Sequence, residues 1–193
     1  MRTWPSRDEP PALVDPRRWG GVIGLLGGMW FVGSYSAPLG RLASTLAWVT
    51  GSVLTAVALF ALYLRRVPLG ELVRPRRLAL ATYCGCVVGE LVLIAAGSRL
   101  LAAWERSELR PALIVAVVGL HFLPFAWAFQ ERMFLHLGAC LTLLGAVGLL
   151  AGALGVPRAA DALAVVAGLT MLTVVTLYAV GRFRPAASTR PSG

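Results

Sequence analysis

Six blocks of about twenty mostly apolar residues dominate this chain and restrict the folds open to it. A helix needs about twenty apolar residues to cross the hydrocarbon core of a bilayer. Helices of a soluble domain this small would keep a polar outer face, which these blocks lack. The sequence therefore predicts an all-α fold, a polytopic membrane bundle of about six transmembrane helices at residues 19–37, 42–64, 78–99, 111–130, 133–155 and 159–181.

Composition supports the membrane interpretation. The chain has 193 residues, of which 58% are hydrophobic and 14% charged, and its mean hydropathy is +0.74. Soluble domains average about 45–50% apolar and about 25% charged residues. The excess of apolar residues lies within the six blocks, as expected if lipid surrounds them.

Arginine is unequally distributed between the two ends of the predicted helices. After six crossings, both termini, the 65–77 loop and the 131–132 turn lie on one side, and they hold thirteen of the eighteen arginines. Arginine-rich connections stay in the cytoplasm. We therefore expect a multi-pass protein of the cell membrane with both termini in the cytoplasm.

The two ends of the chain differ in composition from the bundle at 19–181. Residues 1–18 are rich in charge and in proline, and residues 182–193 are polar. Neither segment can bury an apolar face, so both are predicted to be disordered cytoplasmic tails. The first apolar block is expected to remain uncleaved, because acidic residues interrupt the basic leader that a signal peptide requires.

The positions of the glycines and arginines indicate which partners the protein contacts. Glycines recur four residues apart in three of the blocks, at Gly20, Gly24 and Gly28, at Gly85 and Gly89, and at Gly148 and Gly152. Such spacing lets helices approach closely, which permits homo- or hetero-oligomers through these faces. Arginines at the block ends suit the anionic headgroups of the lipid bilayer. They do not gather along one face, so no nucleic-acid partner is expected.

Glu90 lies near the middle of the third block. Placing a carboxyl group there costs about 2.5–3.5 kcal/mol on insertion scales, so such a residue usually faces the bundle interior with a partner. Tyr83 lies two helical turns away on the same face and could contribute a hydroxyl group. Both residues are candidates for a binding site.

The fourth block contains the other deep ionisable residue, His121, close to Pro124 and Gly119. Proline has no backbone N–H, so the carbonyl of Leu120 loses its usual helical donor. We expect a helix kink there and a free acceptor beside His121. A structural role for His121, as a hydrogen-bonded residue that fixes the bundle, is the alternative to a functional one. Counted along the helices, Glu90 and His121 lie at similar depths and are predicted to pair.

Other chemistry finds little support in the sequence. His121 and His136 differ in depth by about one helical turn, which disfavours joint haem ligation. Two histidines and one glutamate on three helices are few ligands for zinc. The three cysteines lie in apolar blocks and are not expected to form a disulfide framework. No metal, no cofactor and no catalytic set are therefore expected, and the protein is not predicted to be an enzyme.

The stretch Gly119-x-His121-Phe122-x-Pro124-Phe125-x-Trp127-x-Phe129 resembles a segment in a family of small, uncharacterised bacterial membrane proteins. The resemblance covers about a dozen positions, and a general hydropathy match extends beyond them. It implies a multi-span fold in the bacterial inner membrane and importance for His121 and Pro124. The turn after the motif, Glu131-Arg132, departs from the family pattern.

Two functions remain as hypotheses. The first is a small transporter or permease in which Glu90 and His121 form a polar site at the membrane midplane, a place where transporters bind substrates and ions. The second is an accessory or structural subunit that packs against another membrane protein through its glycine-rich faces. A lipid-modifying enzyme ranks below both.

The predicted orientation can be tested with reporter fusions. A reporter inserted in the 65–77 loop should report a cytoplasmic location, because this loop carries the largest number of arginines. The same reporter in the 38–41 connection should report the opposite side. An external location for the 65–77 loop would refute the orientation.

Overall fold

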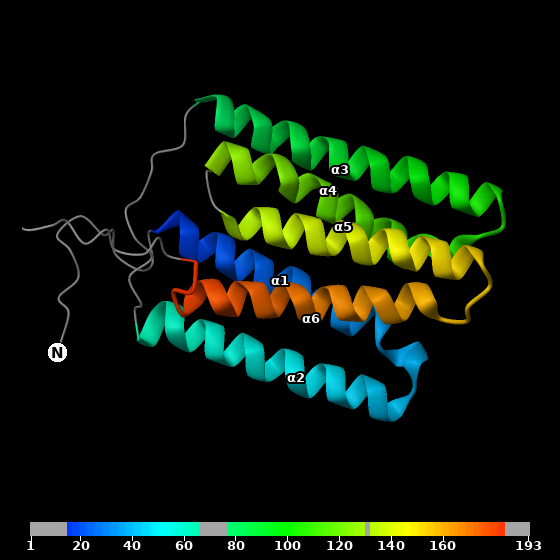
Figure 1. The fold of residues 1–193 in the computed structure, drawn as a ribbon, viewed down its shortest axis with the longest axis horizontal. Coiled ribbons are helices and arrows are strands. Elements are labelled where there is room, and N and C mark those ends of the chain that lie inside the picture. The colour runs from blue at the N-terminus through cyan, green and yellow to red at the C-terminus, as the bar shows by residue number, and fades with distance from the viewer. Residues whose placement is uncertain (1–14, 66–76, 130–131, 184–193) are drawn as a thin grey trace, which may run out of the picture.

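The computed structural model describes residues 15–65, 77–129 and 132–183, and within them six long helices lie side by side in one bundle (Figure 1). No strand occurs among these residues, so the predicted all-α bundle is confirmed. The long helices are α1 (Pro16–Tyr35), α2 (Arg41–Leu59), α3 (Arg77–Ala103), α4 (Arg110–Phe129), α5 (Arg132–Ala153) and α6 (Ala159–Ala179). Three short helical segments join them: η1 (Ala37–Leu39), the π-helical η2 (Phe60–Leu64) and η3 (Ser107–Leu109).

Most helix ends agree with the prediction within a few residues, and two differ for clear reasons. The first helix begins at Pro16, inside the predicted disordered tail, because Asp15 caps it by accepting a hydrogen bond from the Arg17 amide and proline suits the first helical turn. The remainder of that tail lies outside the described residues. Helix α3 continues to Ala103, four residues past the predicted end, since nothing in Leu100–Ala103 opposes a helix. At the other terminus, Phe183 packs against buried residues, so the predicted tail at 182–193 begins too early.

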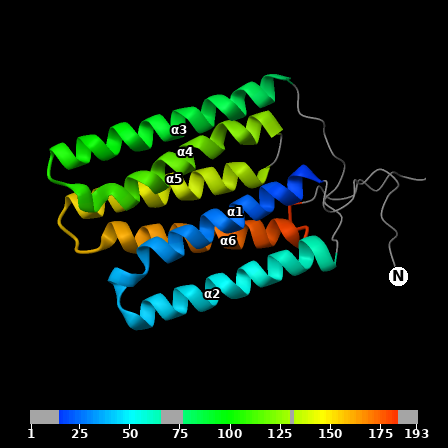
Figure 2. The ribbon, with the colours of Figure 1, turned by 180° about the vertical axis from the view of Figure 1, so that it is seen from behind.

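The helices alternate in direction along the bundle. α1, α3 and α5 begin at the end where α2, α4 and α6 finish, as Figures 1 and 2 both show. The short connections of the opposite end, between α1 and α2, α3 and α4, and α5 and α6, lie together. The described chain therefore starts and finishes at the same end of the bundle.

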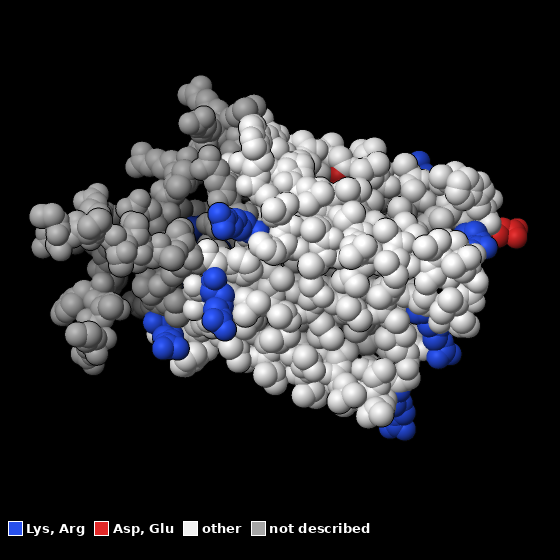
Figure 3. Space-filling view, in the orientation of Figure 1, with Lys and Arg blue, Asp and Glu red and all other residues white. Residues whose placement is uncertain are grey.

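Five of the six helices are long and apolar enough to cross a membrane: α2 with η2, α3, α4 with η3, α5 and α6. Helix α1 is not among them, because its six glycines and the two arginines of its first turn, Arg17 and Arg18, lower its mean hydropathy. It nevertheless runs alongside α6 for most of the bundle length (Figure 2). In the space-filling view, basic side chains lie near the two ends of the bundle (Figure 3). A zone with almost no charged side chains, called the apolar belt below, separates them.

The helices are buried to very different degrees. α6 packs against α1, α2, α4 and α5, and 61% of its most apolar stretch is buried. One cluster of buried side chains joins α6 to α4 and α5, and a second joins it to α1 and α2. α3 lies at the edge of the bundle, where its main neighbour is α4, and only 6% of its most apolar stretch is buried. The bundle is thus a five-helix body with α3 attached along α4.

A buried arginine joins α1 to the end of α2. Arg18, only 3% exposed, donates a hydrogen bond from its guanidinium to the carbonyl of Leu62 and lies 3.8 Å from the Asp15 carboxylate. Leu62 belongs to the π-helical turn η2, where the helical hydrogen-bond register changes. This contact fixes the two helix ends beside each other.

Glycine contacts set the closest helix approaches. A Cβ atom on Gly168 of α6 would lie 2.7 Å from the carbonyl oxygen of Gly28 in α1. A Cβ on Gly119 of α4 would collide with the backbone of Thr142, and one on Gly145 of α5 with the backbone of Ala116. The glycines predicted from four-residue spacing divide into two groups: Gly24, Gly28, Gly148 and Gly152 pack inside the bundle, whereas Gly20, Gly85 and Gly89 face open space.

Substitutions at these glycines should separate the two groups. Gly119→Ala should lower the free energy of unfolding by about 1–3 kcal/mol, because α4 and α5 must move apart to admit the methyl group. Gly85→Ala, the matched control, should be neutral or stabilising by up to about 1 kcal/mol, since alanine favours the helix. The midpoint of thermal unfolding in detergent measures both effects. Equal changes for the two variants would contradict the close α4–α5 contact.

Candidate functional site

Glu90 and His121 meet at the junction between α3 and α4. The Nδ1 atom of His121 lies 2.5 Å from Oε2 of Glu90, and the two side chains are 14% and 18% exposed. The predicted pairing of these residues is therefore confirmed. Both helices carry their ionisable residue well away from either end, so the pair lies within the apolar belt.

The contact between the two side chains is close but not aligned as a hydrogen bond. Nδ1 of His121 is buried and has no aligned hydrogen bond among the described residues, so the contact has the distance of a salt bridge without the direction of a hydrogen bond. The contact thus brings a histidine nitrogen and a carboxylate oxygen together between two helices.

Aromatic rings surround His121. Its imidazole stacks on Phe122 with ring centroids 4.5 Å apart and meets the Phe125 ring edge-on at 4.8 Å. Phe134 of α5 contacts both phenylalanine rings. The aromatic rings exclude water from this side of the pair.

Tyr83 contributes to this aromatic cluster rather than to the ion pair itself. Its ring stacks on Phe125 at a centroid distance of 5.4 Å, and the residue is 42% exposed. The predicted common face of Tyr83 and Glu90 is therefore present. A direct role for the Tyr83 hydroxyl in binding stays a prediction.

Pro124 does not interrupt α4. The helix continues from Arg110 through Pro124 to Phe129. Pro124 has no N–H to donate to the Leu120 carbonyl, however, and Leu120 is 47% exposed. The predicted bend at Pro124 stays a prediction. The sequence associated Gly119 with a helix kink. In the structure, Gly119 instead allows the close contact with α5 described above.

The remaining candidates have local structural roles. Nδ1 of His136 lies 2.8 Å from the Arg132 carbonyl, one turn earlier in α5, and the His136 ring packs near Phe183. All three cysteines are free, and Cys84 and Cys140 are exposed on the outside of their helices. Within the described residues, no three His, Cys, Asp or Glu side chains gather closely enough to hold a metal ion.

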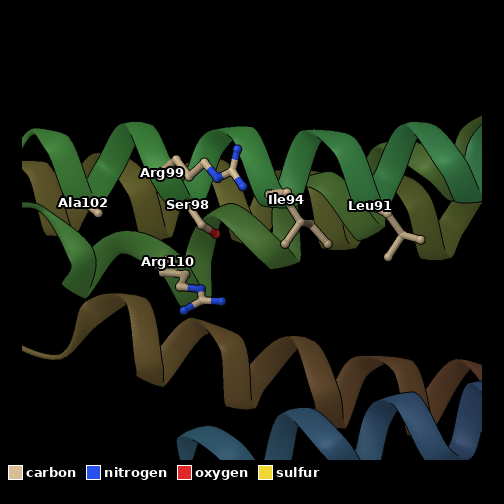
Figure 4. Close-up of a pocket in the computed structure, with 7 residues that line it drawn as sticks. Leu91, Ile94, Ser98, Arg99, Ala102 and Arg110 are labelled. Carbon is tan, nitrogen blue, oxygen red and sulfur yellow. The ribbon is translucent and has the colours of Figure 1, made fainter.

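An open cleft lies along the same junction between α3 and α4, towards the end of the bundle opposite the termini (Figure 4). Its volume is about 460 Å³, and it is lined by Leu91, Ile94, Ala95, Ser98, Arg99, Ala102 and Arg110. The sequence did not predict it. Arg99 lies four residues before the end of α3, and this position inside an apolar helix was the available signal.

Comparisons with known proteins give no relative. No family model, curated protein or solved structure matches this chain. The resemblance to the family of small membrane proteins therefore stays a hypothesis, and function has to be inferred from the geometry of the α3–α4 junction.

The ion pair should be visible as energetic coupling. Glu90→Gln and His121→Gln should each lower the free energy of unfolding by about 1–3 kcal/mol, because each leaves the other polar group without its partner. The double variant should lose less than the sum of the two, by about 0.5–3 kcal/mol. Thermal or denaturant unfolding in detergent measures this coupling. Glu108→Gln, which removes the exposed partner of Arg106, is the control and should change stability by less than about 1 kcal/mol. Strict additivity would contradict the pairing.

Proposed function

We propose that the protein is a small proton-coupled membrane transporter, in which the Glu90–His121 pair takes up and releases a proton as α3 moves relative to α4. The observation that carries this proposal is the ion pair between two helices within the apolar belt. Ionisable pairs at this depth are expensive to maintain, and proton relays are among their main uses. Imidazole changes charge near neutral pH, so it suits a cycle driven by a physiological proton gradient.

The placement of α3 supports a moving part. α3 has one main neighbour, α4, whereas α6 packs against four helices. Helices with few buried apolar contacts open most easily. Neutralising one member of the Glu90–His121 pair would weaken the attraction that holds α3 to α4 at mid-height. Proton uptake could thus be linked to a change in the position of α3.

The cleft supports access to the pair. Ile94, which lines the cleft, lies one helical turn from Glu90 on α3. Arg99 and Arg110 line the cleft nearer to the end of the bundle. The cleft therefore leads from that end towards the pair, and one of its lining residues, Leu91, directly follows Glu90 in α3. A small movement of α3 would connect the two.

A second candidate function has its own observation. Gly85 and Gly89 on α3 face open space, where a neighbouring helix could approach closely. This favours an accessory subunit whose α3 docks on another membrane protein. Crosslinking from a cysteine-free variant with a single photoreactive residue at position 85 would reveal such a neighbour.

A pH-jump experiment tests the transport proposal without knowledge of the substrate. Protein reconstituted on a supported membrane should give a transient current when the pH falls from about 7.5 to about 6, as protons enter the membrane to reach the pair. Glu90→Gln and His121→Gln should abolish this current, and Glu108→Gln in the end connection should preserve it. A current of normal size in both Glu90 and His121 variants would refute the proposal.

A further inference from the structure

The cleft between α3 and α4 carries two cations without carboxylate partners. Neither Arg99 nor Arg110 forms an ion pair with a described residue, whereas Arg106 nearby is paired with Glu108 at 2.9 Å. Arg110 also lies close enough to Tyr35 of α1 to interact with it electrostatically. No acidic residue lines the cleft. Two guanidinium groups at one site favour an anion, and guanidinium geometry matches phosphate oxygens.

A third polar group supports an anion at this place. The hydroxyl oxygen of Ser98 is buried, lines the cleft and has no hydrogen-bond partner among the described residues. Figure 4 shows this hydroxyl between α3 and the Arg110 backbone, on the side of α3 that faces the cleft. A buried hydroxyl without a partner is costly, and a phosphate oxygen would accept its hydrogen bond.

The rest of the cleft is apolar and extends into the bilayer. Nearer to the middle of α3 than the arginines, the cleft is lined by Leu91, Ile94 and Ala95. Leu91 lies eight residues before Arg99, which corresponds to about 12 Å along the helix. Arg99 lies about 6 Å from the end of α3, and Arg110 begins α4 at the same end. The cations are thus at headgroup height, and the apolar wall is at acyl-chain height.

We propose that this cleft binds one anionic phospholipid of the leaflet at the bundle end opposite the termini. Its phosphodiester group contacts Arg99 and Arg110 and accepts a hydrogen bond from Ser98. One acyl chain follows Leu91 and Ile94 along α3. A soluble anion would satisfy the arginines but would leave the apolar wall unused, which is why the site is assigned to a lipid. Glu90 and His121 do not line the cleft, so lipid binding can be tested separately from proton coupling.

Lipid binding to the full-length protein in detergent tests the proposal. Native mass spectrometry should show tighter retention of phosphatidylglycerol than of phosphatidylcholine with the same chains. Arg99→Gln combined with Arg110→Gln should weaken phosphatidylglycerol binding by about tenfold or more. Arg41→Gln removes an exposed charge from α2 at the same bundle end and should change binding less than about twofold. Equal retention of the two lipids, or an equal loss in the Arg41 variant, would overturn the site.

Two further measurements separate a lipid from a free phosphate. Inorganic phosphate, compared with acetate at equal ionic strength, should not displace phosphatidylglycerol, because it cannot replace the acyl contacts. Ala95→Trp, which narrows the apolar wall and leaves both arginines intact, should also weaken lipid binding. Displacement by phosphate, or unchanged binding in a folded Ala95→Trp variant, would refute a lipid site. An unchanged thermal midpoint confirms that each variant remains folded.

Discussion

The bilayer core contains no water to bind exposed backbone groups, and this constraint shapes every part of the protein. Each apolar segment satisfies its amides and carbonyls internally by forming a helix. Lipid tails are as apolar as leucine, however, so burial of apolar surface drives helix association weakly. Close backbone contacts at glycine replace it, above all between Gly28 and Gly168 and between Gly119 and Thr142. The five-helix body around α6 depends on these contacts.

The same lack of water gives the Glu90–His121 pair its importance. α3 has little buried surface, and Gly85 and Gly89 on it contact nothing within the bundle. Its connection to α4 therefore combines a limited apolar contact with the Glu90–His121 contact, at 2.5 Å, whose histidine ring packs against two phenylalanines. Under the proposed function, protonation of this pair controls the position of a loosely packed helix. The cleft, which lies along the same junction, would change shape with it.

Much of this arrangement could be predicted from the sequence. Apolar block length defines the helices because the bilayer thickness is fixed, and helical rise alone placed Glu90 and His121 at comparable depths. The cleft could not be predicted in this way, since it depends on how α3 is rotated against α4, and spacing along one helix does not determine that rotation. The roles of the glycines were predicted only in part. Gly119 and Gly145 lie at the closest approach of α4 and α5. Neither belongs to the sets of glycines spaced four residues apart from which close packing was predicted. The start of α1 was placed three residues late, because Pro16 was interpreted as a helix breaker when Asp15 makes it a helix start.

A direct measurement of the Glu90–His121 contact in a lipid bilayer tests the central claim that one ion pair fastens α3 to the body of the bundle. Solid-state NMR on reconstituted protein, with ¹⁵N in His121 and ¹³C in the side-chain carboxyl of Glu90, reports the dipolar coupling between the two groups. We expect a detectable coupling, since Oε2, which is bonded to the labelled carbon, lies 2.5 Å from Nδ1. No detectable coupling in fully folded protein would contradict this account.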